Sequence, residues 1–187
     1  MVDDTAVSIA AIQLWTAQGF AATGWRELAD ATGISVRTLI RHYSERSAIF
    51  WSGVPLAAER LRTALAAADP TAPLADVLRT AVLASMAPPT GRLGAQWARL
   101  IESEPELAAS AHRAYRPWRD ALADYLSDRL PQAPPSIPLA LAAAYESASH
   151  TALVQWVASG AGDDPSRAVD EALRWLGVFA TAHTVDT

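Results

Sequence analysis

Residues 25 to 43 read WRELADATGISVRTLIRHY, and this stretch decides what fold is expected of the rest of the chain. Its pattern predicts two short helices joined by a tight turn. Gly33 supplies the positive φ that a sharp turn after Thr32 requires. Ser35 then acts as a helix N-cap, because its hydroxyl can accept a hydrogen bond from an amide in the next turn.

The second of these helices is expected to have an inward apolar face and an outward polar face. Val36, Leu39 and Ile40 are predicted to face inward. The outward side chains are Arg37, Thr38, Arg41 and His42. Arg and Thr hydrogen-bond phosphates and base edges, and Arg can do so bidentately, so this face suits a DNA groove. A solvated helix face is the alternative, and for His42 both interpretations stay open.

Composition indicates a folded protein rather than a disordered tail. The 187 residues are 51% hydrophobic, which is enough for one core or for a small head on a larger body. The absence of cysteine excludes disulfides and thiolate metal sites. No apolar run approaches the roughly 20 residues of a membrane helix, and no basic leader precedes one, so we expect a cytoplasmic protein without a membrane partner.

The charge distribution is uneven. The formal net charge is -5, although affinity for nucleic acid comes largely from neutralising phosphates. Residues 34 to 46 nevertheless hold three arginines and a single glutamate, Glu45, so the proposed groove-facing element is locally positive.

The remaining segments also have helical spacing, and no strand pattern of useful length is found. Thr23 and Ser44 are expected to cap the helices that follow them, and Pro117 to kink a long helix. The four prolines of residues 131–138 predict the clearest loop. The expected helices run from Asp3 or Asp4 to Gly19, then over 25–31, 35–43, from 45 to a kink or break near Pro55, 56–68, 74–86, 93–103, 106–130, 139–159 and 166–182.

The first fifty residues, from Ala10-Ala11, Leu14-Trp15, Gly19-Phe20 and Thr23 to the Gly33-Ile34-Ser35 turn and Tyr43, form a series with a specific order and spacing. This series resembles the DNA-binding domain of TetR-type transcriptional regulators. The resemblance implies an all-α fold with a three-helix helix-turn-helix head over residues 1–50. It also implies a ligand-binding and dimerisation body of about six helices over 51–187. Residues 35–51 and 59–65 are most similar to an actinobacterial subgroup that includes mycofactocin-linked regulators. The matching positions are Ala10-Ala11, Leu14-Trp15, Gly19-Phe20, Thr23, Leu28-Ala29, Ala31, Gly33-Ile34-Ser35, Arg37-Thr38-Leu39 and Tyr43.

The resemblance also implies roles for single residues. The helix from Ser35 to Tyr43 would lie in the major groove, with Arg37 and Thr38 nearest the base edges and His42 or Tyr43 near phosphate. Thr23 would offer its hydroxyl or the start of its helix to phosphate, and Arg46 would lie close to the DNA backbone. Three departures from the family pattern are Ile40, where many members have an aromatic residue, the acidic Asp3 and Asp4 in the N-terminal arm, and Trp25, which is unusually large for the opening of its helix.

An effector pocket is predicted in the body, whose aromatic residues stand among many alanines. Buried aromatics are usually core, but pockets between helices are also common ligand sites. We expect a mostly apolar pocket with Glu146 and His150 as polar anchors. Its proposed border is Met86, Trp97, Tyr115, Trp118, Tyr145, Glu146 and His150.

Metal binding and catalysis are not expected. Glu146 and His150 stand four apart, but no HExxH-like pattern accompanies them, so a helix pair or a polar group in a pocket is favoured. Ser149-His150 lacks a nucleophile elbow and a third partner. The sequence therefore predicts neither a cofactor nor an enzyme.

The last two helices predict a homodimer. The first has a stripe of small residues, Ala140, Ala143, Ala144, Ser147 and Thr151, which permits close helix approach. The last has an apolar stripe, Val169, Ala172, Leu173, Leu176 and Phe179. Such a dimer would place two reading helices about 34 Å apart on a palindromic DNA operator. The expected function is a repressor released by a small apolar effector; the alternative is a helical ligand-binding or interaction protein without specific DNA binding.

Overall fold

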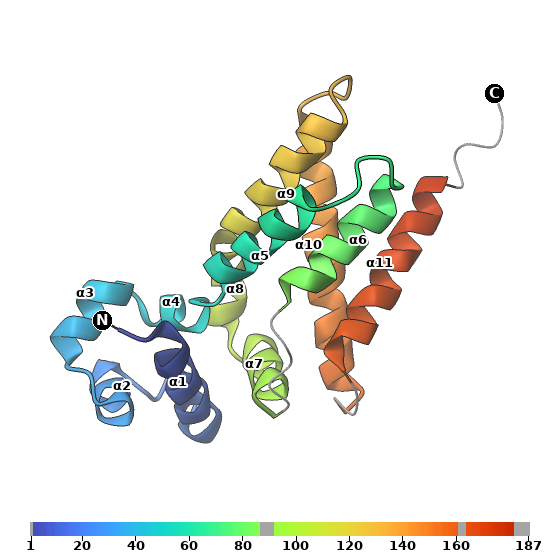
Figure 1. Ribbon diagram of the computed structural model, residues 1–187. Helices are drawn as coiled ribbons and strands as arrows, with labels where there is room; N and C mark the ends of the chain where they lie inside the picture. The colour runs from blue at the N-terminus through green and yellow to red at the C-terminus, as the bar shows by residue number, and fades with distance from the viewer. Residues whose placement is uncertain (1, 87–91, 161–163, 182–187) are drawn as a thin grey trace. The chain divides into compact units, whose positions relative to one another are not determined.

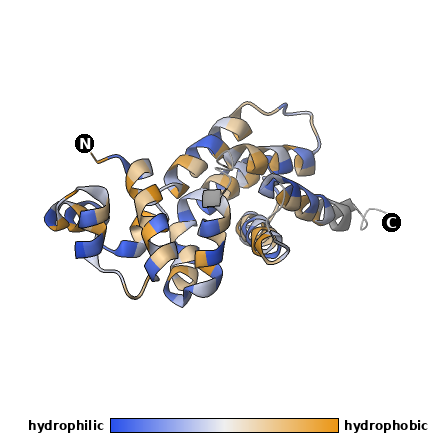
Figure 2. Cartoon of the chain, turned by 90° about the horizontal axis from the view of Figure 1, so that it is seen from below, coloured by the Kyte–Doolittle hydropathy of each residue, from blue (hydrophilic) through white to orange (hydrophobic). Residues whose placement is uncertain are grey.

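The computed structural model describes residues 2–86, 92–160 and 164–181 (Figure 1). Within these ranges every regular element is an α-helix, which confirms the all-α prediction. Figure 2 shows both polar and apolar colouring along the helices, as amphipathic helices have. Among the described residues, no helix is long and apolar enough to cross a membrane.

The chain packs as two compact units that do not follow the order of the sequence. Unit 1 comprises Met1–Pro55 and Thr90–Tyr115, and unit 2 comprises Leu56–Pro89 and Arg116–Thr187. The sequence instead suggested one division near residue 50. That division concerns function and stays a prediction, whereas the packing joins a later segment to the head.

The head of unit 1 is built by α1 (Asp4–Gln18), α2 (Trp25–Thr32), α3 (Val36–Tyr43) and α4 (Arg46–Phe50). Asp3 caps α1 by accepting bonds from the amides of Thr5 and Ala6, and α1 ends at Gly19 with φ 85°, as predicted. The caps predicted at Thr23 and Ser44 are wrong. Gly24 is the N-cap of α2 and Glu45 that of α4.

Two further helices, α7 (Arg92–Ser103) and α8 (Pro105–Ala114), complete unit 1. Helix α7 packs on α1 and α8, and α8 packs on α4. Aromatic rings fill this core: Trp97 stacks on Phe50 with centroids 5.3 Å apart, and Trp51 donates a 2.8 Å hydrogen bond from its indole nitrogen to Ser110 Oγ. The head therefore shares its hydrophobic core with residues about fifty positions later in the sequence.

Unit 2 contains most of α5 (Val54–Ala66), together with α6 (Leu74–Ser85), α9 (Arg116–Arg129), α10 (Ser136–Ala158) and α11 (Pro165–Thr181). Helix α10 packs on α9 and on α11, and α11 packs on α6 (Figure 1). The core includes Leu122, Leu126 and Val169, each fully buried. Burying such aliphatic side chains is the main source of stability in a helical bundle.

Prolines mark helix starts in this chain more often than kinks. The break predicted near Pro55 is found, with α5 starting one residue before the proline. The kinked helix predicted over 106–130 is wrong: α8 ends at Ala114, and Pro117 lies in the first turn of α9. Pro138 likewise lies in the first turn of α10, where proline is tolerated because the first amides have no intrahelical partner.

Candidate functional site

The turn between α2 and α3 has the geometry that the sequence predicted. Gly33 is left-handed, with φ 69° and ψ 13°, and its amide donates to the Ala29 carbonyl at 2.9 Å. Ser35 Oγ accepts a hydrogen bond from the Thr38 amide at 3.3 Å and lies 2.9 Å from Thr38 Oγ1. The cap fixes the first turn of α3, so the side chains that follow it project in defined directions.

Helix α3 exposes two arginines that make no ion pair or hydrogen bond with the described residues. Arg37 and Arg41 are both exposed and stand four apart, on the side of α3 away from buried Leu39 and Tyr43. Thr38 is half-buried beside them. Two unpaired cations on an exposed helix face in an acidic protein form a suitable surface for phosphates and base edges.

Two of the three residues predicted to face inward on α3 do not. Leu39 is fully buried, but Val36 is 36% exposed and Ile40 is 43% exposed. Tyr43 takes the inward position instead, at 6% exposure. With about 100° between successive residues, Leu39 and Tyr43 lie on one side of the helix and Ile40 lies on its flank.

His42 and Tyr43 both interact with Asp4. The Tyr43 hydroxyl donates to Asp4 Oδ1 at 2.7 Å, and His42 Nε2 lies 2.9 Å from the same oxygen. The hydrogen bond from Tyr43 is the main cause that lowers the pKa of Asp4. Burial, followed by the bond to Asp4, raises the pKa of Tyr43, so the phenol stays neutral. In this conformation His42 and Tyr43 connect α3 to α1 through Asp4.

Thr23 and Arg46, assigned to phosphate by resemblance, have structural partners here. Thr23 is fully buried, and its hydroxyl donates to the Gly19 carbonyl at 3.2 Å. Arg46 donates from Nη1 to the carbonyls of Phe20 and Thr23, and its guanidinium lies 4.4 Å from the centroid of the Phe20 ring. In this conformation both side chains hold the α1–α2 connection together and do not project to solvent.

Arg26 is a candidate that sequence reasoning missed. It is exposed in the first turn of α2 and has no hydrogen bond or ion pair with the described residues. A basic side chain outside the α3 pattern gives no periodic signal. Its position on the first helix of the helix-turn-helix could have identified it, because that helix crosses the DNA backbone in this class of motif.

The predicted effector-pocket residues are divided between the two units. Trp97 and Tyr115 belong to unit 1. Both pack edge-on against Trp51, with ring centroids at 5.5 Å and 5.6 Å. These two residues therefore have a packing role in the core of the head, and a shared pocket with the other five stays a prediction.

The other five predicted residues belong to unit 2. Trp118 is buried and donates from Nε1 to Ser85 Oγ at 3.1 Å. Tyr145 is buried, and burial raises its pKa. Glu146 accepts a 2.5 Å bond from Arg119, and both side chains are largely buried, at 18% and 12% exposure. Met86 and His150 are half-buried. Glu146 is therefore already paired, which its sequence position did not reveal.

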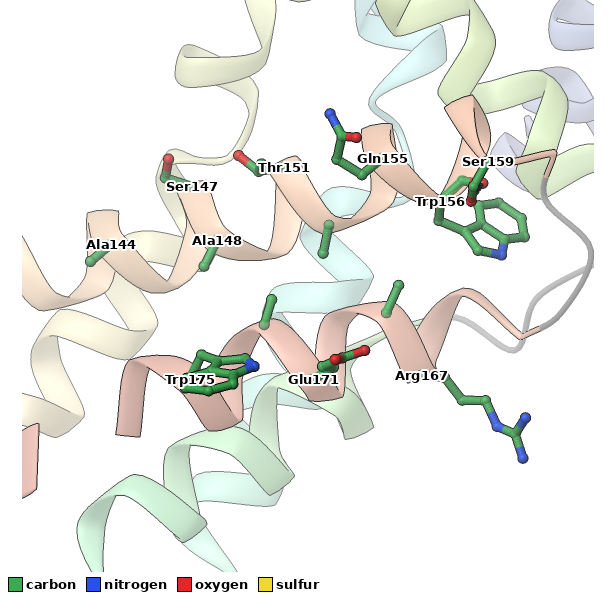
Figure 3. Close-up of a pocket in the computed structure, with 13 residues that line it drawn as sticks. Ala144, Ser147, Ala148, Thr151, Gln155, Trp156, Ser159, Arg167, Glu171 and Trp175 are labelled. Carbon is green, nitrogen blue, oxygen red and sulfur yellow. Dashed lines mark hydrogen bonds between the residues drawn. The ribbon is translucent and has the colours of Figure 1, made fainter. Parts of the chain in front are cut away.

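A groove of about 940 Å³ lies between the outer faces of α10 and α11 (Figure 3). Small residues, including Ala144, Ser147 and Thr151, line it on α10, and Trp175 lines it on α11 with 59% of its surface exposed. Part of the predicted apolar stripe is not available to a partner, because Val169 and Leu173 are buried within the unit. The side chain of Phe179 lies outside the described residues.

Nothing in the described residues resembles a metal centre, since no group of three or more His, Asp or Glu side chains is close enough to hold an ion. The chemical features of the molecule are instead the cationic face of α3 and an all-helical body. A reading helix that follows a left-handed glycine turn, with two exposed arginines on its outer face, defines a helix-turn-helix DNA-binding protein.

Sequence profiles agree with that class. Residues 9–51 match the profile described as bacterial regulatory proteins, tetR family, and residues 72–178 match the MftR C-terminal domain. The chain belongs to the TetR family of transcriptional regulators, with a C-terminal domain of the MftR type. The resemblance noted from the first fifty residues is therefore confirmed.

One curated relative is a putative mycofactocin biosynthesis transcriptional regulator, MftR, from Mycobacterium tuberculosis. It is 32% identical over 125 residues, which cover 66% of this chain and 63% of the relative. The match thus spans less than two thirds of the relative's length.

Solved structures of the same fold include two FadR regulators. The Thermus thermophilus repressor, crystallised with lauroyl-CoA, has a TM-score of 0.63 and 23% identity, and the match covers 99% of this chain and 97% of that one. The Bacillus subtilis regulator, crystallised with stearoyl-CoA, has a TM-score of 0.63 and 13% identity over 93% and 97% of the two chains. At these identities the likeness establishes the fold.

Proposed function

We propose that this chain is a ligand-responsive repressor that binds a palindromic operator as a homodimer and is released by a small, mostly apolar effector. The observation that carries the DNA-binding part is that Arg37 and Arg41 on α3 are exposed and make no ion pair or hydrogen bond with the described residues. The net charge is -5, and most of the other arginines in the described residues pair with carboxylates or donate to carbonyls. Arg37 and Arg41 are available to a partner that carries negative charge, as is Arg26 on α2.

Binding to DNA from around the protein's own gene tests this proposal. Fragments are titrated at about 50 and about 200 mM salt, because phosphate contacts make affinity fall steeply with salt. Arg37→Ala and Arg41→Ala should each abolish the specific footprint or weaken binding by about 10- to 100-fold, the cost expected for a lost base contact.

A matched control is Arg99→Ala, which removes an exposed arginine of α7 in the same unit. It should bind the operator as tightly as the parent. Failure of the parent to protect any fragment would favour the alternative, a helical ligand-binding protein without specific DNA binding. The net charge of -5 and the acidic Asp3 and Asp4 near α3 are the observations that favour this alternative.

The effector part of the proposal is supported by the aromatic side chains of unit 2 and by the FadR structures, which were solved with acyl-CoA ligands. We propose an effector with an acyl chain or a similar apolar body. It would lower operator affinity by binding better to a state in which the two heads do not fit the operator.

Lauroyl-CoA and stearoyl-CoA are the first probes for an effector. Each should change tryptophan emission, raise the melting temperature and weaken operator binding, whereas free coenzyme A should do none of these. If a broad panel of apolar and acyl compounds leaves emission and melting unchanged, the pocket proposal fails, and the DNA-binding result is unaffected.

A further inference from the structure

Two exposed apolar side chains stand on the otherwise polar outer surface of α3. Val36 is 36% exposed and Ile40 is 43% exposed, although both are β-branched residues that usually pack inward. They are four positions apart, so they form a short apolar row along the helix. The core does not need them, since Leu39 and Tyr43 already fill the inward positions.

This apolar row runs directly beside the arginine row. Arg37 follows Val36 and Arg41 follows Ile40, so each apolar side chain is about 100° from an unpaired cation on the same helix. The hydrogen bond from the Thr38 amide to Ser35 Oγ fixes the first turn of α3, which contains Val36. If α3 docks with its arginines in a DNA groove, the apolar row therefore enters the same groove.

The chemistry of that groove provides one apolar partner. The edges of the bases in the major groove carry hydrogen-bond donors and acceptors, and the C5-methyl group of thymine is the exception. A protein partner is a poorer fit, because a specific interface needs about 800 Å² from each side and two side chains flanked by arginines supply a small part of that area. The unpaired arginines also select a negatively charged partner.

We propose that Val36 and Ile40 read thymine methyl groups next to the bases or phosphates that Arg37 and Arg41 contact. This inference rests on the proposed DNA binding by α3 and adds a specificity role for two residues outside the polar set. Contact with one methyl group should contribute about fourfold in affinity, which corresponds to about 0.8 kcal/mol for one buried methyl group. Each operator half-site should therefore contain thymine positions at which any other base lowers the affinity.

Replacement of thymine by deoxyuridine tests the inference, because it removes only the methyl group. Each thymine of a footprinted operator is replaced in turn, and dissociation constants are measured by fluorescence anisotropy at fixed salt. The parent should lose about fourfold at the contacted thymines and nothing at the others. Ile40→Ala should bind the natural operator more weakly and should no longer respond to deoxyuridine at one of these positions; Val36→Ala should behave in the same way at another position.

Arg41→Ala is the control for this cycle. It should weaken binding overall while a loss at deoxyuridine persists, because this variant keeps the Val36 and Ile40 side chains. Val36→Ala and Ile40→Ala replace exposed β-branched residues by a better helix former, so their melting temperatures should match that of the parent.

Two results would overturn the inference, and they differ. If the parent binds every deoxyuridine operator as tightly as the natural one while Arg37→Ala still abolishes binding, the methyl contact is absent and the proposed function stands. If the parent gives no footprint at all, both the contact and the proposed function fail.

Discussion

The hydroxyl of Tyr43 donates a 2.7 Å hydrogen bond to the carboxylate of Asp4, so the last residue of α3 is fixed to the first residue of α1. His42 Nε2 lies 2.9 Å from the same oxygen. The acidic N-terminal arm departs from the family pattern. Through Asp4, it has a defined role in positioning the reading helix α3.

Asp4→Asn should lower the free energy of unfolding at neutral pH by about 1 kcal/mol, a value reduced for the 51% exposure of the Asp4 side chain. The pKa of Asp4 is lowered in the folded state, so its contribution is present above the unfolded value of about 3.9 and is lost as pH falls through the folded pKa. The difference in melting temperature between the parent and the variant should therefore shrink below about pH 4.

The control for this pH profile is Asp30→Asn, which removes an exposed carboxylate of α2 that has no hydrogen bond or ion pair with the described residues. Its melting curve should follow that of the parent at every pH. Parallel profiles for parent and Asp4→Asn across the acid range would contradict a stabilising role for Asp4.

Arg46 and Arg41 should respond differently to replacement by alanine. Arg46 donates to two carbonyls and covers the Phe20 ring, with 21% of its side chain exposed. Its loss should cost about 2 kcal/mol of stability, because two hydrogen bonds from a charged donor are lost and the Phe20 carbonyl keeps only the bond from the Thr23 hydroxyl. Arg41→Ala should leave the melting temperature unchanged and weaken DNA binding. Equal thermal stability of the two variants would show that Arg46 is not structural.

The Arg119–Glu146 pair should show strong coupling in a double-mutant cycle. Either single change, Arg119→Met or Glu146→Gln, leaves a largely buried charge poorly compensated and should cost about 2 kcal/mol or more. The double variant Arg119→Met/Glu146→Gln should lose clearly less than the sum of the two single changes. Denaturant unfolding provides the four free energies.

An exposed ion pair on the same helix serves as the comparison. Arg116 and Asp120 are 77% and 54% exposed, and Arg116→Met should change stability by less than about 0.5 kcal/mol. Simple additivity for Arg119 and Glu146 would mean that their contact adds nothing to the stability of α9 on α10.

Trp175→Glu tests the proposed dimer. Trp175 is 59% exposed beside the groove between α10 and α11, and a buried tryptophan at an interface commonly contributes 2 kcal/mol or more, so the dimer should dissociate at about 30-fold higher concentration. Leu56→Glu changes another exposed apolar residue, at 58% exposure on α5, and should leave the molecular mass from light scattering unchanged. A parent that is monomeric at micromolar concentration would contradict the dimer.

Local signals in the sequence were enough to predict the helices and the turn of the reading head. Gly33 and Ser35 could be assigned because backbone sterics and capping act within a few residues. The exposure of Val36 and Ile40 was missed because hydrophobicity pointed to Val36, Leu39 and Ile40 as the inward set, whereas the inward side of α3 is formed by Leu39 and Tyr43. The partners of Glu146 and Arg46 are 27 and 26 residues away in the sequence, and no local pattern reports such contacts.

The shared core of the head has a consequence for building hybrid regulators. Profile boundaries suggest a portable DNA-reading cassette over residues 9–51, yet Phe50 and Trp51 pack on Trp97, and Trp51 bonds to Ser110, which lie within the C-terminal profile. A chimera joined at residue 51 would pair these two rings with foreign partners and leave mismatched cavities. A graft intended to move operator specificity to another body should therefore carry α7 and α8 with the head.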